Sequence, residues 1–448
     1  MTRTPSLGAI SPGLQRVAQL ARDNPEMVFT TLAHHIDETF LKKAYELTRK
    51  DGAPGIDGKT GAQYATNLGG NLKDLLNRAK SGTYRAPPVR RAYIPKGNGE
   101  KRPLGIPTFE DKVLQRAVKE VLEAVYEQDF KDCSWGFRPG RDAHGALKAL
   151  WDGVSGLGGC WLLEVDIRKF FDTVDHVHLR NILDQRIGDG VVRRLIGKWL
   201  NAGVMEGLEL SHPQAGTPQG GVISPLLANV YLHEVLDTWF ERDVRPRMKG
   251  RVFLVRYADD FVIGIEEEED AHQIMGVLPK RFGKYGLTLH PDKTRLIDFR
   301  RPDRHTRLPG ESGAEGPSSF DFLAFTHVWG RSRHGYWTVR QLTAKDRFVR
   351  ALRKVVDFVR EHRHMPIKEQ HRLLCLKVKG HYGYFGLTCN MRRVSAFRKA
   401  VRYAWFTWLS RRAERRSLTW SEFDQLEKRW PLPPPRLPRS VFRRPARA

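Results

Sequence analysis

Two adjacent aspartates, Asp259 and Asp260, are the residues of this sequence that most strongly suggest chemistry. They follow Tyr257 and Ala258, and an apolar, β-prone run lies on each side, which predicts a hairpin with both carboxylates at its tip. Two carboxylates in one turn are costly to bury unless a cation neutralises them. Hard divalent cations prefer oxygen ligands, and two such ions can clamp the attacking and leaving oxygens of a displacement reaction. A solvated Asp-Asp turn is the alternative.

A third carboxylate, Asp166, closes a strand that we predict over residues 161–167. The interior of this strand is apolar, so the strand should be buried, and a two-metal site needs a third acid to bridge its ions. The alternative role for such an aspartate is a helix N-cap. Asp172 or Asp175 is the better candidate for that role, because helical spacing of apolar residues begins at about Asp175.

Glycine-rich and basic turns accompany these acids. Residues 216–221 form a turn-rich loop that enters an apolar helix over 222–236, and Gln219 in this loop can donate and accept hydrogen bonds. Residues 92–106 predict a hairpin whose turn, Gly97–Gly99, is surrounded by Lys96, Lys101 and Arg102. A helix is expected over residues 108–127, where apolar residues recur on one face.

The charge of the chain indicates a polyanionic partner. The 448 residues contain 76 Lys and Arg against 51 Asp and Glu, a net charge of +25. Residues 331–448 alone hold 30 basic and 8 acidic residues, so +22 of this charge lies in the last quarter of the chain. A near-neutral body followed by a strongly basic region predicts a catalytic core joined to a nucleic-acid-binding region.

Cysteine usage and hydropathy suggest a cytoplasmic protein. The four cysteines form no C-x-x-C pair, so we expect neither a zinc site nor a disulfide framework. The N-terminus has no apolar signal segment, and no apolar run is long enough to span a membrane.

The motifs occur in an order that resembles the reverse transcriptase core, and in detail the group II intron-encoded reverse transcriptase/maturase family. The resemblance covers roughly residues 35–435. It rests on Lys96 and Arg102, FRPGR (137–141), DIRKFFD (166–172), TPQGGVISP (217–225), YADD (257–260) and GLTLHPDK (286–293), with GIDG (55–58) and YGYFGL (382–387) at the two ends.

The resemblance implies an α+β fold of the right-hand polymerase type. We expect an N-terminal extension over 1–34, loosely ordered up to about residue 30, and reverse transcriptase fingers and palm over 35–325. An all-helical, basic thumb/maturase region should follow over 326–430, and a Pro/Arg-rich tail, extended or disordered, over 431–448. No Cys/His cluster follows Cys389, so the resemblance is to the type without an endonuclease domain, and we do not expect second-strand DNA cleavage.

The resemblance also implies roles for individual residues. Asp166, Asp259 and Asp260, with the Ile167 carbonyl, would hold two Mg²⁺ ions, for which Mn²⁺ could substitute. Lys96 and Arg102 would grip the incoming triphosphate, Gln219 would contact the nucleotide, and Phe171 would exclude a 2′-hydroxyl. Lys293 would protonate the pyrophosphate. Template and intron RNA contacts would come from Arg138, Arg141, Arg347, Arg350, Lys354, Tyr382, Tyr384, Arg392 and Arg393.

These assignments have structural alternatives. The two basic residues of the 92–106 hairpin could belong to a solvated tip, Phe171 could be an ordinary core aromatic residue, and Lys293, Arg138 and Arg141 could be surface charges.

The implied function is an RNA-directed DNA polymerase that copies its intron RNA and assists the splicing and mobility of that intron. Its partners would be the intron RNA template, a DNA primer or target and dNTPs, in a ribonucleoprotein complex without a membrane. Two alternatives remain: a domesticated reverse transcriptase in DNA repair or phage defence, and an RNA-binding splicing factor with incidental polymerase activity. Intron RNA sequences flanking the gene would favour the intron-encoded polymerase and maturase over these alternatives.

Overall fold

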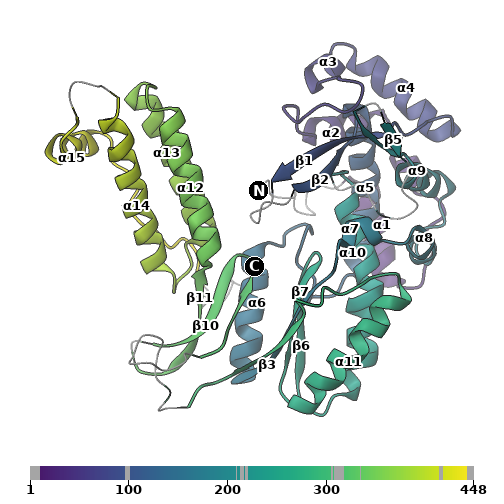
Figure 1. Ribbon diagram of the computed structural model, residues 1–448. Helices are drawn as coiled ribbons and strands as arrows, with labels where there is room; N and C mark the ends of the chain where they lie inside the picture. Colours follow the sequence, from purple (N-terminus) through teal and green to yellow (C-terminus); the bar gives the residue numbers. More distant parts are fainter. Residues whose placement is uncertain are drawn as a thin grey trace. The chain divides into compact units, whose positions relative to one another are not determined.

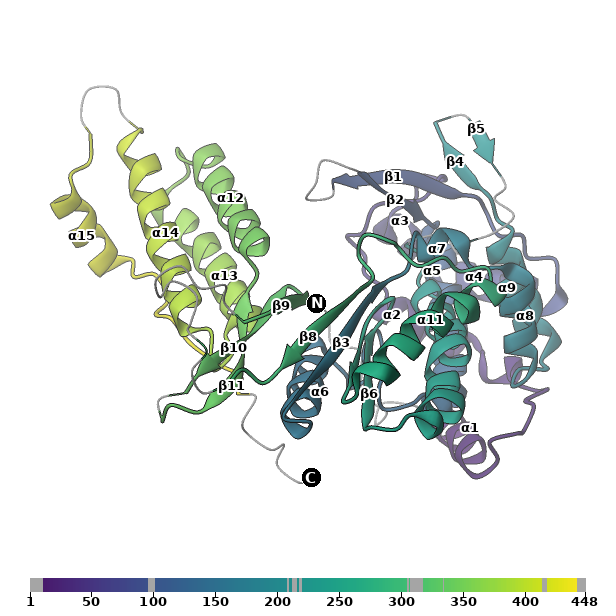
Figure 2. The same ribbon diagram turned by 60° about the horizontal axis from the view of Figure 1, so that its bottom comes forward.

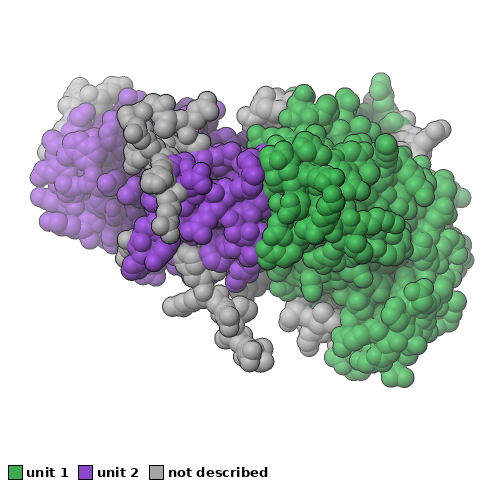
Figure 3. Space-filling model, turned by 90° about the horizontal axis from the view of Figure 1, so that it is seen from below, with its two compact units in different colours: residues 1–146, 161–296 green, residues 147–160, 297–448 purple. Residues whose placement is uncertain are grey.

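The computed structural model describes residues 11–95, 101–207, 209–211, 216, 220–303, 306, 317–332, 334–412 and 417–440. The fold is mixed α/β, as expected. The chain divides into two compact units, coloured separately in Figure 3. Unit 1 comprises residues 1–146 and 161–296, and unit 2 comprises residues 147–160 and 297–448.

The predicted acidic hairpin lies in a four-stranded sheet with the order β6-β7-β3-β8. Its strands are β3 (Gly159–Asp166), β6 (Val252–Tyr257), β7 (Asp260–Ile265) and β8 (Arg295–Arg300). Strand β7 is central and antiparallel to both β6 and β3. Both the hairpin and the buried strand before Asp166 are therefore confirmed, and the sheet brings together three acids that lie far apart in the sequence.

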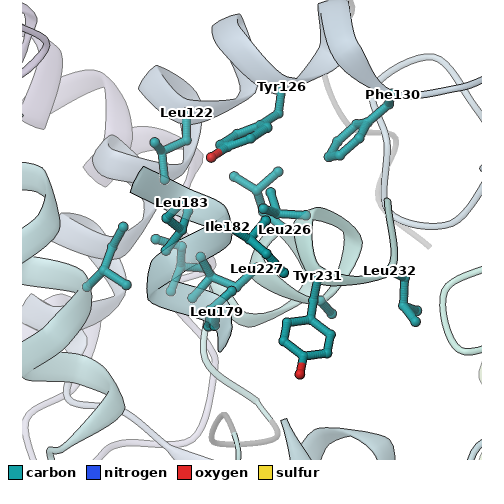
Figure 4. Close-up of a cluster of buried hydrophobic side chains, with 14 of the residues drawn as sticks. Leu122, Tyr126, Phe130, Leu179, Ile182, Leu183, Leu226, Leu227, Tyr231 and Leu232 are labelled. Atoms are coloured by element: carbon teal, nitrogen blue, oxygen red, sulfur yellow. The ribbon is translucent and has the colours of Figure 1, made fainter. Parts of the chain in front are cut away.

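Helix α5 (Phe109–Asp129) forms the centre of unit 1 and confirms the helix expected over 108–127. Thr108 caps it, and apolar residues around most of its circumference are buried because α1 (Pro12–Asp23), α2 (Glu38–Leu47) and α10 (Ser224–Leu232) pack against it. Figure 4 shows part of this core, where Leu122 and Tyr126 of α5 lie near Leu226 and Leu227 of α10.

The prediction of loose order up to residue 30 is wrong for the described part of that segment. Ser11 caps α1, Pro12 occupies its first turn, and one face of the helix buries Leu14, Val17 and Ala21. The segment looked polar in the sequence because the other face is solvated, whereas the apolar face is covered by α5.

A second sheet of unit 1 has the order β2-β1-β4-β5. Its strands are β1 (Val89–Pro95), β2 (Lys101–Ile106), β4 (Val204–Glu206) and β5 (Glu209–Ser211). Strands β1 and β2 pair antiparallel from Arg90 opposite Ile106 to Pro95 opposite Lys101, which confirms the strands of the predicted basic hairpin. Its turn, including Lys96, lies outside the described residues.

Short helices complete unit 1 (Figures 1 and 2). Asp175 accepts hydrogen bonds from the backbone amides of Val177 and His178 and so caps α8, as predicted. Helix α10 continues into two π-helical stretches, η3 and η4. The helix predicted over residues 222–236 is therefore present, and helical structure continues beyond its predicted end. The elements are η2 (Ala33–His35), α3 (Gly61–Ala65), α4 (Leu68–Ser81), α7 (Phe170–Thr173), α8 (His176–Asp184), α9 (Gly190–Leu200), η3 (His233–Thr238), η4 (Phe240–Val244), η5 (Arg245–Arg247) and α11 (Glu268–Lys284), with α6 (Ala143–Gly156) shared by both units.

Unit 2 contains a small sheet as well as helices, which corrects the expectation of an all-helical region from residue 326. The antiparallel sheet has the order β11-β10-β9, and its strands are β9 (Ser319–Phe322), β10 (Phe325–Arg331) and β11 (Trp337–Thr343). Its helices are α12 (Lys345–Glu361), α13 (Ile367–Phe385), α14 (Met391–Ser410) and α15 (Trp420–Arg429). Strand β10 escaped the sequence analysis because its residue types do not alternate clearly. Phe325, His327 and Trp329 are buried, but His327 is polar and the intervening Val328 is apolar.

The helices of unit 2 share one apolar core. Trp405 is fully buried there, and its indole donates a hydrogen bond of 2.8 Å to Gln370. Residues 431–440 contain no helix and are tied to the helices of unit 2: Leu432 is buried, and the Tyr382 hydroxyl donates to the Pro433 carbonyl at 3.2 Å. None of the described helices is long and apolar enough to cross a membrane.

A buried ion pair lies beneath the acidic hairpin in unit 1. Arg256 of β6 and Asp237 of η3 are both fully buried, and two parallel N–H···O bonds of 2.7 and 2.5 Å join them. The guanidinium also donates to Asn229 at 2.9 Å, Ser134 at 2.8 Å and the Ala258 carbonyl at 3.0 Å. Burial alone would lower the pKa of Arg256, but the charge and hydrogen bonds of Asp237, together with Cys133 and Asp259, raise the pKa above its usual value. One cation thus joins four segments of the chain.

Removing one partner of this pair should destabilise unit 1 strongly. Asp237→Asn leaves the buried Arg256 cation without its counter-charge, and we expect a loss of about 3–5 kcal/mol in the free energy of unfolding, measured by urea denaturation. The double variant Arg256→Met/Asp237→Leu should recover much of that loss, because it buries no charge. In the exposed pair Lys249–Glu269, the control variant Glu269→Gln should change stability by less than about 0.5 kcal/mol. A loss near the control value for Asp237→Asn would contradict this role.

Candidate active site

The acidic tip is a tight turn with an unusual backbone. Tyr257 pairs with Asp260, so Ala258 and Asp259 are the two residues of the hairpin loop. Ala258 has φ +58°, a left-handed conformation that two-residue hairpins require and that glycine normally supplies. A non-glycine residue held there costs on the order of 1 kcal/mol or more, so the surrounding structure must enforce it.

Two contacts hold this turn in its conformation. Arg256 holds the Ala258 carbonyl, as described above. Gly136 lies against the other side, where an added Cβ would come within 2.5 Å of the Ala258 nitrogen. Asn229 fixes Gly136 in turn by donating to its carbonyl at 2.8 Å. The turn is therefore clamped between the buried ion pair and the segment that precedes residue 137.

The third acid lies directly across the strand ladder. Asp166 is the register partner of Asp260 in the β3–β7 pair, and directly opposed residues in such a ladder have Cα atoms about 4.5–5.5 Å apart. The Asp166 carbonyl accepts a hydrogen bond of 2.8 Å from the His290 amide, and the Arg168 amide donates to Thr288 at 2.8 Å. These bonds flank the buried residue Ile167 and fix the end of the strand. The sheet thus brings the three predicted metal ligands to one place.

The electrostatics of the three acids suit a cation. Asp259 is half-buried, and burial raises its pKa above the ordinary value; the negative charge of Asp166 adds to this rise, while Arg102 and Arg256 oppose it. Asp260 is exposed, and the Asp166 side chain is 34% exposed, so both can be approached from solvent. A carboxylate whose pKa is raised by burial and by a neighbouring acid, as for Asp259, fits a hard divalent cation, which would remove the repulsion.

In the structure Lys293 supplies the positive charge beside these acids. Its Nζ lies 2.5 Å from Asp166 Oδ2, and the lysine side chain is 61% exposed. The ammonium therefore stands at a position where a metal ion would meet the same carboxylate. Among the described residues no group of three His, Cys, Asp or Glu side chains is arranged so that it could hold a metal ion; the Asp166 carboxylate is paired with this lysine instead.

Arg102 and Phe171 are two of the predicted nucleotide-binding residues that the structure describes. Arg102 is exposed on β2 and close enough to lower the pKa of Asp259. Phe171 is half-buried in α7 and meets Phe170 edge-on at 5.3 Å between ring centroids. Phe170 is the fully packed member of this pair, with 2% of its surface exposed, so Phe171 is the one that retains an accessible surface. Lys96 and Gln219 lie outside the described residues.

The described ends of the glycine-rich loop pack against the chain itself. Gly216 has φ +95°, and a Cβ there would approach the Phe171 carbonyl oxygen within 2.9 Å. Its amide donates to the Val174 carbonyl at 2.8 Å, and its carbonyl lies 2.6 Å from His176 Nε2. The glycine thus permits the loop to lie directly behind the peptide of Phe171.

The structure corrects the prediction for Arg138 and gives Arg141 a similar role. Arg138 is 4% exposed, pairs with Glu127 at 3.0 Å and donates to the carbonyls of Lys131 and Ser134. Arg141 pairs with Asp132 at 2.6 Å and donates to the Asp132 carbonyl. Both guanidiniums hold the 131–136 loop together. A template contact is excluded for the buried Arg138, because its donors are directed at protein acceptors.

The same segment contains a residue that the sequence analysis missed. Phe137 is 49% exposed and has φ +58°, and its ring centroid lies 6.3 Å from that of Tyr257. An aromatic residue in this backbone conformation is a genuine outlier. No sequence signal distinguishes Phe137 from a core aromatic residue, because only the inward turn of its basic neighbours reveals that it faces solvent.

The predicted RNA-contacting residues of unit 2 divide into two groups. Tyr382 is 4% exposed and belongs to the helical core, which corrects its prediction as an RNA contact. Tyr384 donates to the Leu323 carbonyl at 2.9 Å. The basic residues of the set are at the surface: Arg347 and Arg350 lie near Asp346 with side chains 46% and 39% exposed, and Lys354, Arg392 and Arg393 are exposed on α12 and α14.

Several known proteins are similar in sequence to this chain. Group II intron-encoded protein LtrA of Lactococcus lactis subsp. cremoris is 40% identical over 353 residues, which cover 65% of this chain and 58% of LtrA. Protein YkfC of Escherichia coli (strain K12) is 34% identical over 324 residues, or 64% of this chain and 84% of YkfC. Nuclear intron maturase 2, mitochondrial, of Arabidopsis thaliana is 27% identical over 249 residues, which cover 47% of this chain and 31% of that protein. The chain thus spans less than two thirds of the length of LtrA.

A protein-family model gives the more general result. The model described as reverse transcriptase (RNA-dependent DNA polymerase) matches residues 94–327, which is more than half of the chain. This segment contains both strands of the acidic hairpin, the opposing strand β3 and Lys293, which pairs with Asp166 at the end of β3. Members of this family generally use divalent metal ions, as the paired carboxylates suggest. Because the match spans the whole acidic site, the chain belongs to the reverse transcriptase family.

Proposed function

We propose that this protein is an RNA-directed DNA polymerase that reverse transcribes its intron RNA and assists the splicing and mobility of that intron. The observation that carries the catalytic half is the meeting of Asp166 with the Asp259–Asp260 turn across one strand ladder. Unit 1 would supply fingers and palm, and the helices of unit 2 would supply the thumb and maturase surface. The similarity to LtrA and to an intron maturase supports the second half.

The three acids would hold two Mg²⁺ ions, with the Ile167 carbonyl as a further ligand and Mn²⁺ as a possible substitute. When bound, these ions would lower the pKa of the primer 3′-hydroxyl and stabilise charge on the transferred phosphoryl group. The chain's own contribution is positioning: Arg256 and Gly136 fix the turn, and the β3–β7 register fixes Asp166 opposite it. A rigid arrangement avoids the cost of reorganising these groups during reaction.

The remaining residues would handle the nucleotide. Arg102, with Lys96 on the same hairpin, would bind the triphosphate, because guanidinium and phosphate form paired hydrogen bonds. Gln219 would contact the nucleotide, and Phe171 would face its sugar. Lys293 would donate a proton to the departing pyrophosphate, since its flexible, exposed ammonium already lies at the edge of the acidic site.

Loss of either turn carboxylate should abolish polymerisation. We expect Asp259→Asn or Asp260→Asn to reduce primer extension on an RNA template at least about a thousandfold in Mg²⁺, a loss of roughly 4 kcal/mol of transition-state stabilisation. RNA affinity should remain nearly normal, measured by filter binding. The control Asp23→Asn, which changes an exposed aspartate of α1, should extend normally. Near-normal extension by either turn variant would refute the metal assignment.

Phe171 should determine sugar selectivity. Phe171→Ala removes bulk from the accessible member of the Phe170–Phe171 pair, and we expect the ratio of dNTP to rNTP incorporation on an RNA template to fall at least about tenfold, the effect of roughly 1.4 kcal/mol of lost discrimination. Phe171→Tyr retains the ring and should retain the ratio. If the alanine variant is stable and equally selective, Phe171 is a packing residue and the discrimination lies elsewhere.

The basic helices of unit 2 would bind the folded intron RNA. Arg347, Arg350 and Lys354 project from α12, and Arg392 and Arg393 begin α14. Their exposed cations can neutralise phosphates, and a protein that binds folded RNA better than unfolded RNA shifts the folding equilibrium of that RNA. This activity needs none of the three acids of unit 1.

Splicing assistance should therefore survive loss of the polymerase site. The double variant Asp259→Asn/Asp260→Asn should accelerate excision of the flanking intron at low Mg²⁺ as wild type does, whereas Arg392→Glu/Arg393→Glu should weaken intron binding about tenfold or more at moderate salt. Lys249→Glu/Arg251→Glu applies the same change in charge to unit 1 and serves as the control. If wild type gives no acceleration, or no intron flanks the gene, a domesticated reverse transcriptase becomes the better account.

A further inference from the structure

Phe137 has features that neither the fold nor the proposed catalytic residues explain. Its side chain is 49% exposed, so the ring adds little to the core. Its backbone is in the left-handed region, at φ +58°, although it carries a large side chain. A conformation that is unfavourable locally and leaves half of a large side chain exposed persists only where the surrounding structure imposes it, and such residues cluster at functional sites.

The neighbours of Phe137 impose this exposure. Arg138 and Arg141 turn inward, and their guanidiniums bind the carbonyls of residues 131–134. Gly136, on the other side, packs so closely against Ala258 that a side chain cannot enter. In this segment the basic residues therefore build the loop, and the aromatic ring is the side chain that they present to solvent.

The exposed ring lies beside the acidic turn. Its centroid is 6.3 Å from that of Tyr257, with 43° between the ring planes. Tyr257 is half-exposed and precedes Asp259 by two residues. Two accessible aromatic faces thus adjoin the carboxylates, and both belong to segments that the Arg256 network holds in place: the Trp135 amide donates to the Arg256 carbonyl at 2.8 Å.

We propose that Phe137, together with Tyr257, forms an aromatic platform that packs against the nucleotides next to the primer terminus. This inference rests on the proposed polymerase function. A primer 3′-hydroxyl that reaches the three acids places its own nucleotide and that nucleotide's partner within a few ångströms of the turn. Aromatic side chains are suited to this contact, because every base has a π-face and every sugar an apolar edge. Phe137 is thus a positioning residue that aligns the primer end without touching the reacting atoms.

The test compares a variant that loses the aromatic ring but accepts the backbone conformation with a variant that keeps an aromatic ring. Phe137→Gly tolerates φ +58° and lacks the ring, whereas Phe137→Trp retains an aromatic face. We expect Phe137→Gly to be as stable as wild type in urea unfolding, yet to bind a primed RNA template about fivefold to a hundredfold more weakly, measured by fluorescence anisotropy. Phe137→Trp should bind within about threefold of wild type. The control Met275→Ala removes another exposed apolar side chain, 40% exposed on α11, and should bind normally.

An abasic scan identifies the nucleotide and the strand. Single abasic sites are placed in turn at the primer-terminal nucleotide, its template partner and the two positions behind each. At the contacted position, base removal should weaken wild-type binding and have no further effect in Phe137→Gly. An effect on the primer strand alone identifies the primer base as the partner, and an effect on the template strand alone identifies the template base.

The failures of the two proposals can be distinguished. If wild type binds primed template but does not extend it in Mg²⁺ or Mn²⁺, the polymerase function fails. If wild type extends primers and Phe137→Gly binds and extends equally well, the platform is refuted while the polymerase function stands. Equal abasic effects in wild type and Phe137→Gly at every position would also refute the platform.

Discussion

The buried pair between Arg256 and Asp237 is the interaction on which the acidic site depends. A charged pair in a core is a poor source of net stability, because both groups lose their hydration. Its value here is geometric: the planar guanidinium has five N–H donors, and it directs them at η3, α10, residue 134 and the turn itself. A lysine could not fix so many directions at once. The turn conformation of Ala258 is thus set by a cation that lies below it.

Charge compensation explains the composition of the site as a whole. Three carboxylates converge, and burial and mutual repulsion raise the pKa of Asp259. The chain limits this repulsion with cations at three depths: Arg256 is fully buried, Arg102 is exposed near Asp259, and Lys293 contacts Asp166. The deepest of these cations, Arg256, is fixed by several hydrogen bonds. The shallower two lie on flexible side chains, so they can rearrange when a charged ligand enters.

The two units differ in charge, which fits the different functions proposed for them. Residues 331–448 hold nearly all of the net positive charge, and on the helices of unit 2 much of it is exposed. In unit 1 several arginines instead form ion pairs within the protein: Arg186 with Asp129, Arg138 with Glu127 and Arg256 with Asp237. A count of basic residues therefore overstates how many are available to bind phosphate in unit 1.

The sequence by itself determined the elements and the chemistry. Strand periodicity located β3 and the β6–β7 hairpin, capping chemistry located the start of α8, and the order of the motifs indicated the reverse transcriptase family, because each of these signals is local in the chain. The paired acids at the turn were visible for the same reason, and the ordered motifs around them, rather than the pair alone, favoured a metal site over a solvated turn.

The tertiary structure alone decided the direction of each side chain. The sequence predicted Arg138 as a template contact and assigned no role to Phe137, yet the arginine is buried and the aromatic ring is exposed. Likewise Tyr382 is a core residue, and α1 is ordered because α5 covers its apolar face. Residue type fixes what a side chain can do, whereas burial and hydrogen-bond partners depend on segments more than a hundred residues away, as in the bond from Arg256 to Ser134. Such partnerships leave no local pattern in the sequence, so only the folded chain reveals them.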